Sequence, residues 1–372
     1  MTAMTNAYTP VETALFNLLR LALGVAENVS VHLSVEEWQK LYVLCKQQSV
    51  TGVVCSAIKK LPKDQLPPRP LLLRWATDTE AIRGMNSLMN KEAARLTEIF
   101  DKAGRKTAIL KGPANARLYP DPGCRHCGDI DLWVEGGRES VGKLLYELKL
   151  IKDMTEARVA WHHIHLPRAD HGIETEVHFK TASAKQFCER ALEKYLTEEI
   201  MKSELAPEGF YVPSIKFALV MQLSHLQQHI FSSGLGLRQY ADYMILLLHS
   251  TESDRKEATK AMKSFRMGHA GAAVMWVLGE VFGLDRELML CEPDCKRGKK
   301  ILNLAMTGGN FGKFGRKHSN VFSRWLTSRK KKLSWLMFDP LNVLSSEIKY
   351  YYETISLIPV RIKQRRVGLR VE

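Results

Sequence analysis

The sequence predicts an α+β fold, in which a small mixed sheet with its own helices is flanked by helical regions at both ends. Apolar residues recur at helical spacing up to about residue 100 and again from about residue 213. Between these regions, from residue 107 to 179, the apolar runs shorten to the length of strands. We therefore expect four segments: an N-terminal helical region over 1–100, an α/β core over 101–205, a C-terminal helical domain over 206–295 and a basic helical tail over 296–372.

The composition is that of a folded protein. Of 372 residues, 45% are hydrophobic and 25% are charged, which excludes disorder as the main state. The length suits two or three domains. No apolar run reaches the roughly 20 residues of a membrane-spanning helix, and the longest one, 270–284, carries Glu280. Seven cysteines, an odd number, and the lack of a recognisable secretory signal predict a reduced, cytoplasmic protein.

Three helices are expected before the sheet, and we expect them to serve as a scaffold. Residues 11–23 carry apolar side chains at helical spacing, and residues 35–47 follow Ser34, a residue type that often caps a helix. Prolines at 62, 67, 68 and 70 then interrupt the chain. The stretch 71–103 continues as a long amphipathic segment with almost no helix-breaking residue.

The core is expected to contain four strands and two helices. The elements in order are strand 107–110, helix 114–119, strand 129–134, helix 140–150, and strands 161–166 and 173–179. Asp170-His171-Gly172 lies between the last two strands and supplies residues typical of a tight turn, which predicts a hairpin. This order of strand, helix, strand, helix and hairpin is that of a small α/β layer.

The helical pattern resumes at Pro213. We expect helices over 213–231, 237–249 and 256–282. The tail from Lys296 holds 18 Lys/Arg and four Asp/Glu, whereas the rest of the chain holds 36 of each sign. The net charge of +14 is therefore a property of the tail and not of the whole protein.

The strand 129–134 carries two carboxylates. Asp129 and Asp131 lie two residues apart, so their side chains share one face of the strand, and the apolar residues between them take the other face. Two carboxylates on one face repel each other, and a divalent cation such as Mg²⁺ relieves that repulsion. The alternative is a solvated strand face with two ordinary aspartates.

Two further features favour chemistry on this face. Glu176 lies on a later strand in the same apolar surroundings, and a neighbouring strand would place it beside the two aspartates. Upstream, a strand ends in Lys111-Gly112, and a helix begins at once. The free N–H groups at that helix start predict an anion site, to which Lys111 adds a positive charge for phosphate. Such a set of groups is what metal-assisted phosphoryl or nucleotidyl transfer requires.

This pattern resembles the DNA polymerase β-type nucleotidyltransferase superfamily, in which a strand ends in Gly-Ser and an acidic strand and a third acid follow. It is more closely similar to an uncharacterised bacterial nucleotidyltransferase family that carries Leu-Lys-Gly and then Arg-x-x-Gly-Asp-Ile-Asp-Leu. The matching residues are Leu110-Lys111-Gly112, Arg125-His126-Cys127-Gly128-Asp129-Ile130-Asp131-Leu132, Glu176-Val177-His178, His225, His229, Arg238 and Asp242. The resemblance covers about residues 15–250.

The resemblance implies an enzyme that moves a nucleoside monophosphate from an NTP to a hydroxyl acceptor. Asp129 and Asp131 would hold two Mg²⁺ ions, with Mn²⁺ as the alternative ion. Glu176 would complete the second metal site or take the proton. Lys111 and the amide of Gly112 would neutralise charge on the leaving pyrophosphate. The sequence leaves open which NTP is used and whether the acceptor is a small molecule, a protein or an RNA.

One position departs from the superfamily pattern. The serine that touches the triphosphate in the superfamily is replaced by Pro113, which has no N–H to offer. We expect Lys111 to substitute for that contact. Arg125 is expected to contact phosphate or to fix the loop before the acidic strand. Gly128, at the end of this loop, is also one of the expected nucleotide-binding residues.

The helical motifs of the family are expected to line the nucleotide cleft. His225 and His229 lie four residues apart, as Arg238 and Asp242 do, so each pair shares one helix face. For the histidines, the spacing also suits a metal site, although no third ligand is evident. For Arg238 and Asp242, the alternative is an ion pair on the helix surface, worth about 0.3–0.5 kcal/mol.

The hairpin is rich in histidine. His163 and His165 would share one face of the first strand, with His162 on the other face. His178 shares a face with Glu176 and would either contact the substrate or orient that acid.

Two cysteine pairs have the spacing of zinc ligands. They are Cys124-x-x-Cys127 and Cys291-x-x-x-Cys295. A structural zinc ion needs four ligands in one place, and these pairs lie far apart in the sequence, which favours ordinary thiols.

Basic and aromatic residues alternate in the tail. The basic residues are Arg329-Lys330-Lys331-Lys332 between Trp325 and Trp335, and then Arg361, Lys363, Arg365 and Arg366. This pattern suits contact with RNA or with an anionic membrane surface. The alternative is a solvated helix face that keeps the protein in solution.

Two other classes of function compete with the transferase. One is a non-catalytic nucleotide-binding or antitoxin-like interaction protein on the same fold. The other is an RNA-binding adaptor that acts through the tail. Metal-dependent release of pyrophosphate separates the enzyme from both.

Overall fold

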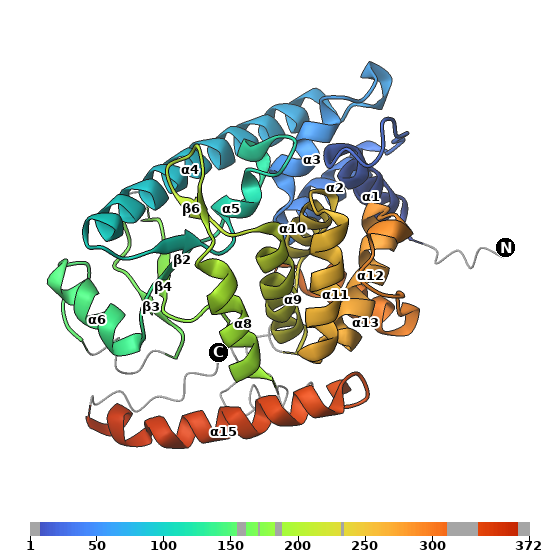
Figure 1. Cartoon of the computed structure of the whole chain (residues 1–372). Coiled ribbons are helices and arrows are strands. Elements are labelled where there is room, and N and C mark those ends of the chain that lie inside the picture. Colours follow the sequence, from blue (N-terminus) through green and yellow to red (C-terminus); the bar gives the residue numbers. More distant parts are fainter. Residues whose placement is uncertain are drawn as a thin grey trace.

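The structure is a computed structural model that describes residues 8–154, 161–169, 172–182, 188–231, 234–310 and 334–363. A small sheet with its own helices lies beside a bundle of helices, and the long helix α15 crosses beneath both (Figure 1). The predicted α+β class with helical flanks is therefore confirmed. No helix within these ranges combines the length and the hydropathy that crossing a bilayer requires.

The sheet holds four strands in the order β1-β2-β4-β3. The strands are β1 (Thr107–Ile109), β2 (Ile130–Val134), β3 (His163–His165) and β4 (Thr175–His178). β2 runs antiparallel to β1 and parallel to β4, and β3 pairs antiparallel with β4, which confirms the hairpin. The register places Asp131 opposite Glu176, and Glu176 opposite His165.

β2 is buried on both faces, whereas an alternation of acidic and apolar residues is typical of a strand that is buried on one face only. On one face Ile130, Leu132 and Val134 are fully buried in a core to which α4 and α6 contribute. On the other face Trp133 joins the main core together with α8 and the C-terminal helices. Asp131, on this second face, is only 1% exposed. Its carboxylate must therefore find its partners inside the protein.

Four helices precede the sheet. They are α1 (Pro10–Ala22), α2 (Val35–Gln48), α3 (Thr51–Ile58) and α4 (Arg69–Lys102), with a 3-10 turn at Lys63–Gln65. Ser34 caps α2 as expected, because its hydroxyl accepts a hydrogen bond from the N–H of Glu37 at 3.3 Å. α3 was not predicted. At Gly52 it approaches the loop before β2 so closely that a Cβ would lie 2.3 Å from the carbonyl oxygen of Cys124.

The helices around the sheet are only partly those expected. α5 (Pro113–Ala116) and α6 (Arg138–Glu147) correspond to the two helices predicted in the core, and a 3-10 turn lies at Pro122–Cys124. After β4 the chain forms α8 (Glu189–Ile200) and a short hairpin of β5 (Glu204–Leu205) and β6 (Tyr211–Val212), which were not predicted. Leu192 and Leu196 of α8 are buried in the main core.

The C-terminal helices correct one prediction. α9 (Ile215–Phe231) and α10 (Leu237–Leu248) match expected helices, but the single helix over 256–282 is wrong. The chain forms α11 (Glu252–Ser264), α12 (Gly268–Val277) and a π turn at Leu278–Phe282, followed by a 3-10 turn at Arg286–Leu288 and α13 (Cys295–Gly308). The break lies at Arg266, whose φ of 56° is left-handed. It allows α11 to pack against α9 while α12 packs against α13.

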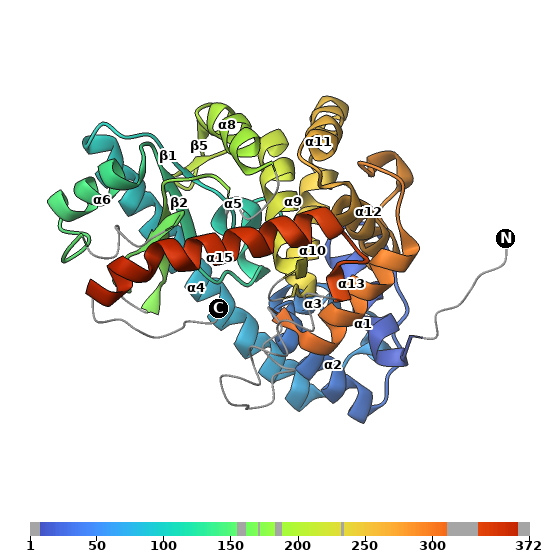
Figure 2. The same cartoon turned by 90° about the horizontal axis from the view of Figure 1, so that it is seen from below.

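The last described helix, α15 (Pro340–Lys363), lies across the face seen in Figure 2. Trp335 and Phe338, just before it, and Val343 in its first turn are buried in the main core. Farther along, Lys349 forms an ion pair with Glu189 of α8. These contacts fix the N-terminal half of α15 to the body of the protein.

The outer side of α15 is apolar. Its exposed large side chains are Leu341, Leu344, Ile348, Tyr351, Tyr352, Ile355 and Ile358. Arg361 and Lys363 fall in the last turn of the helix. The basic cluster Arg329–Lys332 with Trp325, and the residues Arg365 and Arg366, lie outside the described residues.

Candidate active site

Three carboxylates meet where β2 and β4 lie side by side. Asp129 directly precedes β2, and Asp131 is the second residue of β2. Glu176, on the parallel neighbour β4, lies opposite Asp131. The expectation that a later strand brings Glu176 beside the two aspartates is therefore confirmed.

Lys111 lies between the first two carboxylates. Its Nζ forms an ion pair with Asp131 and lies 3.8 Å from Oδ1 of Asp129. Burial of Lys111 favours the neutral amine, but the charges of Asp129 and Asp131 outweigh burial and raise its pKa above the usual range. Lys111 therefore carries a positive charge inside the acidic cluster.

Gly112 makes the sharp turn from β1 into α5. Its φ is 66°, and a Cβ at this position would lie 3.1 Å from the carbonyl oxygen of Asp129, so the turn requires glycine. The N–H groups of residues 114–116 donate to the carbonyl oxygens of Lys111 and Gly112. The turn itself therefore uses the N–H groups of residues 114–116, and an anion contact of the Gly112 amide stays a prediction. Lys111 remains as the cationic group of this segment.

His178 is the second cation beside Asp131. Its Nε2 lies 3.1 Å from Oδ1 of Asp131 and 3.5 Å from Oε2 of Glu176. Burial lowers the pKa of His178, but hydrogen bonds to the two carboxylates more than offset burial and raise this pKa to about 9. In return, Lys111 and His178 overcome the burial of Asp131 and hold its pKa below the usual range. At neutral pH His178 is thus an imidazolium and Asp131 a carboxylate.

The pKa of Asp129 shifts in the opposite direction to that of Asp131. The charge of Asp131 raises the pKa of Asp129, although Lys111 acts against this effect. One lysine therefore does not fully compensate the negative charge gathered here. Asp131 and Glu176 also offer ligand oxygens that lie within 4.8 Å of each other. Uncompensated charge and oxygen donors suit Mg²⁺ or Mn²⁺, so the residues present fit a divalent cation.

A buried ion pair fixes the loop before β2. Arg125 donates from Nε and Nη2 to the two carboxylate oxygens of Asp242 in α10, both at 2.6 Å. The hydroxyl of Tyr119 donates to the same carboxylate at 2.7 Å. Of the two roles expected for Arg125, these contacts support that of fixing the loop. The surface ion pair considered for Arg238 and Asp242 is wrong, because both side chains are buried.

The same loop is held from two other sides. Arg238 of α10 donates to the carbonyl oxygen of His126 at 2.9 Å, and a Cβ on Gly128 would lie 3.4 Å from its Nη1. Asn86 of α4 donates to two carbonyl oxygens of the loop, at 2.7 and 2.8 Å. Sequence reasoning missed Asn86 and Tyr119, because neither belongs to a motif and their partners lie far away along the chain.

The histidine pair of α9 lies near Lys111. The Nε2 atoms of His225 and His229 are 3.0 Å apart. Burial and, to a smaller extent, the charge of Lys111 lower the pKa of His229 to about 4. Burial also lowers the pKa of His225 well below its usual value. Both imidazoles are therefore neutral at pH 7, and their contact with a nucleotide stays a prediction.

An amide pair ties α9 to the lysine turn. Gln222 of α9 and Asn115 of α5 exchange two hydrogen bonds, at 2.8 and 2.9 Å. Both side chains are buried. The pair keeps the histidine-bearing helix in register with Lys111 and Gly112.

The first cysteine pair supports the same loop. Cys127 accepts a hydrogen bond from Nη1 of Arg125 at 3.0 Å, and Cys124 donates to Asp121 at 3.1 Å. Among the described residues, no cluster of metal-ligating side chains includes a cysteine.

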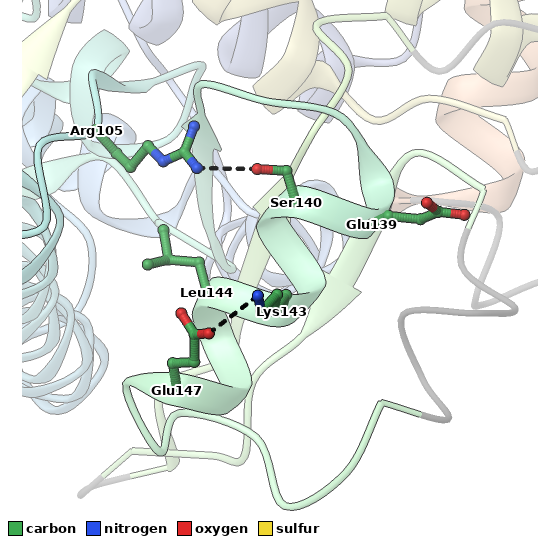
Figure 3. Close-up of a pocket in the computed structure, with 6 residues that line it drawn as sticks. All are labelled: Arg105, Glu139, Ser140, Lys143, Leu144 and Glu147. Carbon is green, nitrogen blue, oxygen red and sulfur yellow. Dashed lines mark hydrogen bonds and ion pairs between the residues drawn. The ribbon is translucent and has the colours of Figure 1, made fainter.

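A hollow of about 420 Å³ lies along α6, as Figure 3 shows. Its lining residues are Arg105, Glu139, Ser140, Lys143, Leu144 and Glu147. Arg105 donates to the hydroxyl of Ser140 at 2.9 Å, and Lys143 lies 3.6 Å from Glu147. The lining includes none of the three carboxylates and not Lys111, so the hollow is separate from the candidate site.

The fold and the site define the class of protein. A small mixed sheet carries two carboxylates at the start of one strand and a third on its parallel neighbour, next to a Lys-Gly turn, and this is a nucleotidyltransferase core. A family model described as "Uncharacterised nucleotidyltransferase" matches residues 34–283, and the chain belongs to this family. The match includes every residue of the candidate site. A comparison with curated proteins found no match.

Breaking the buried ion pair should destabilise the protein. We expect Asp242→Asn to lower the free energy of unfolding by about 3–5 kcal/mol, because Arg125 is left as an uncompensated buried charge. Urea unfolding followed by circular dichroism measures this change. Glu252→Gln is the control, because it removes an exposed pair with Lys256 on α11, and its effect should be much smaller. Equal effects of the two variants would contradict the role of Asp242.

The raised pKa of His178 predicts how stability depends on pH. An unfolded histidine titrates near pH 6.5, whereas His178 in the folded protein titrates near pH 9. The folded state binds this proton more tightly, so its contribution, at most roughly 3 kcal/mol, is complete below about pH 6.5 and is lost as the pH rises through 9. The midpoint temperature of thermal unfolding, measured with a chelator present, should therefore fall less over this pH range in His178→Asn than in the wild type. The same fall of the midpoint in both proteins would show that His178 is not paired with the carboxylates in the folded protein.

Proposed function

We propose that the protein transfers a nucleoside monophosphate from an NTP to a hydroxyl acceptor. Membership of the family gives the class of nucleotidyltransferases. The observation that carries the proposal for this chain is the gathering of Asp129, Asp131 and Glu176 around Lys111. Carboxylates for divalent ions beside a cationic group for phosphate are the parts that nucleotidyl transfer needs.

In the proposed reaction the acceptor oxygen attacks the α-phosphorus, the bond to the bridging oxygen breaks, and pyrophosphate leaves. Asp129 and Asp131, completed by Glu176, would hold Mg²⁺ or Mn²⁺, which when bound neutralises phosphate charge and lowers the pKa of the acceptor hydroxyl. A hydrogen bond from His178 lowers the pKa of Glu176 despite burial, so this carboxylate is ionised, as a ligand of the second metal ion or a proton acceptor must be. Lys111 would face the charge of the leaving pyrophosphate.

The remaining predicted residues fall into three groups in this proposal. Arg238, His225 and His229 would contact the nucleotide from α9 and α10. Arg125 and Asp242 would act by holding the loop before Asp129 in place, as their buried ion pair supports. Gly112 and Gly128 would keep the backbone on both sides of the carboxylates free of side chains.

A non-catalytic nucleotide-binding or antitoxin-like protein is the competing interpretation, and an RNA-binding adaptor is a weaker one. The ionised carboxylates next to Lys111 favour the enzyme, because a binding protein has no need for a proton acceptor at this place. The decisive observation is metal-dependent release of pyrophosphate. The acceptor and the NTP are identified by incubating the protein in a cell extract with each labelled NTP and Mg²⁺, and then analysing which molecule becomes labelled.

Replacing the carboxylates should abolish transfer. We expect Asp129→Asn and Glu176→Gln each to lower kcat by about 10²–10⁴-fold, because they remove a ligand of the cation and the proton acceptor. Release of labelled pyrophosphate in the presence of Mg²⁺ measures this loss. The control is Glu174→Gln, just before β4, whose side chain is 51% exposed and pairs with Arg168, and it should keep the wild-type rate. Turnover of Asp129→Asn at the wild-type rate would refute the assignment.

Asp129→Asn is a cleaner variant than a change at Asp131. Asp131 is buried between Lys111 and His178, so Asp131→Ala would leave two buried positive charges without their partner. We expect this change to lower the free energy of unfolding by about 3–5 kcal/mol in addition to its effect on transfer. Loss of activity in Asp131→Ala is therefore interpreted only beside a measurement of its folding.

We also propose that the tail contacts an anionic lipid surface. The observation that favours lipid over RNA is the exposed apolar side of α15, which includes Leu344, Ile348 and Ile355. An amphipathic helix with basic residues beside its apolar face lies in the interface of a membrane. Arg361 and Lys363, at the end of α15, would add attraction to anionic headgroups.

Truncation after Tyr350 tests the role of the tail. The shortened chain keeps Trp335, Phe338 and Val343 in the core but loses Ile355, Ile358 and the basic end. We expect the full chain to co-sediment with vesicles that contain phosphatidylserine, and the truncated chain to bind at least about tenfold more weakly, with binding that falls as salt rises. Filter retention of RNA is measured in parallel. Unchanged lipid binding, or loss of RNA binding alone, would contradict the proposal.

A further inference from the structure

Histidines cluster at the outer edge of the sheet, beyond the aspartates of the proposed reaction. His162, His163 and His165 belong to β3 or directly precede it, and His178 belongs to β4. Glu176 lies among them. Four imidazoles and a carboxylate in one place are a donor set for a metal ion, and the proposed nucleotidyl transfer does not use His163 or His165.

The topology explains why these side chains meet. β3 is the edge strand of the sheet, and His163 and His165 lie two residues apart on one face of it. In the antiparallel register His165 lies opposite Glu176, and His163 lies opposite His178. Side chains opposite each other on one face of a sheet have their Cβ atoms about 4.5–5.5 Å apart, so their polar ends are able to reach one point.

The distances between the donor atoms suit one small ion. His163, His165 and Glu176 each offer one ligand atom, and these three atoms lie within 4.8 Å of one another. The two Nε2 atoms of these histidines are 3.1 Å apart. Ligands bound tetrahedrally to an ion at about 2.0–2.1 Å lie roughly 3.4 Å from each other. The three side chains therefore need only small rotations to ligate one ion.

We propose that His163, His165 and Glu176 bind a divalent transition-metal ion of the Zn²⁺ type. Two imidazole donors favour Zn²⁺ and related ions, whereas Mg²⁺ prefers oxygen ligands alone. Nε2 of His162 lies 2.9 Å from Nδ1 of His163, so a second imidazole is in place to orient this ligand. Such a partner on the ligating histidine is usual in zinc sites.

The site is open on one side. The side chain of His165 is 63% exposed, whereas those of His163 and Glu176 are 20% and 21% exposed. Three protein ligands leave a fourth position for water or for an oxygen of a substrate, as in zinc sites that take part in catalysis. The inference shares Glu176 with the proposed nucleotidyl transfer, but it requires neither Asp129 nor Asp131.

Binding of Zn²⁺ alone to the full chain, stripped beforehand with a chelator, tests the proposal by titration calorimetry. We expect one ion per chain and an affinity that falls at least about 100-fold in His165→Ala and in the double variant His163→Ala/His165→Ala. Because His165 is mostly exposed, His165→Ala should keep the fold, which circular dichroism without metal verifies. His32→Ala, which removes an exposed histidine far along the chain, is the matched control and should bind as the wild type does.

Two further measurements make the outcome specific. Co²⁺ in place of Zn²⁺ should give the absorption bands of a tetrahedral site with nitrogen ligands in the wild type but not in His165→Ala. Asp129→Asn should keep Zn²⁺ binding even though it abolishes transfer, so failure of one proposal is distinguishable from failure of the other. Unchanged Zn²⁺ affinity in His165→Ala overturns the proposal, and so does loss of Zn²⁺ binding in Asp129→Asn with binding retained in His165→Ala.

Discussion

The arrangement of the site depends on one buried charge, the carboxylate of Asp131. β2 is packed on both faces, so this carboxylate has almost no access to water. A buried charge is tolerated only when it is paired and hydrogen-bonded. Lys111 approaches from the β1 side and His178 from β4, and each becomes more basic through this contact. The need to compensate Asp131 thus brings the Lys-Gly turn and the strand of Glu176 to the same point.

A second buried charge decides where Asp129 lies. Arg125, four residues before Asp129, forms an ion pair with Asp242 of α10. The backbone from Arg125 to β2 is held by hydrogen bonds from Arg238 and from Asn86 of α4. A helix before the sheet and a helix after it in the sequence therefore position one loop. The family match over residues 34–283 includes both helices as well as the sheet.

Local patterns were enough to predict the strands and the meeting of the acids. The apolar alternation located β1 to β4, and the apolar-acid-apolar setting of Glu176 indicated its place beside Asp131. The sequence pattern did not reveal that β2 is covered on both faces, because an acidic alternation is also typical of a solvated strand. Nor did it reveal the pairing of Arg125 with Asp242, because partners 117 positions apart are chosen by packing of the whole fold. The break at Arg266 was missed for the same reason, since it serves the packing of α11 and α12.

The replacement of the superfamily serine by Pro113 is understandable from the charges around it. The N–H groups of residues 114–116 are used within the turn and Pro113 has no N–H, so Lys111 is the charged group of this segment. Lys111 pairs with Asp131, yet the pKa of Asp129 stays raised by the charge of Asp131. Lys111 and His178 therefore do not fully compensate the three carboxylates, and binding of a divalent ion would lower the repulsion further. Lys111 and a divalent cation are thus compatible within one site. Each reduces the part of the repulsion between the carboxylates that the other does not remove.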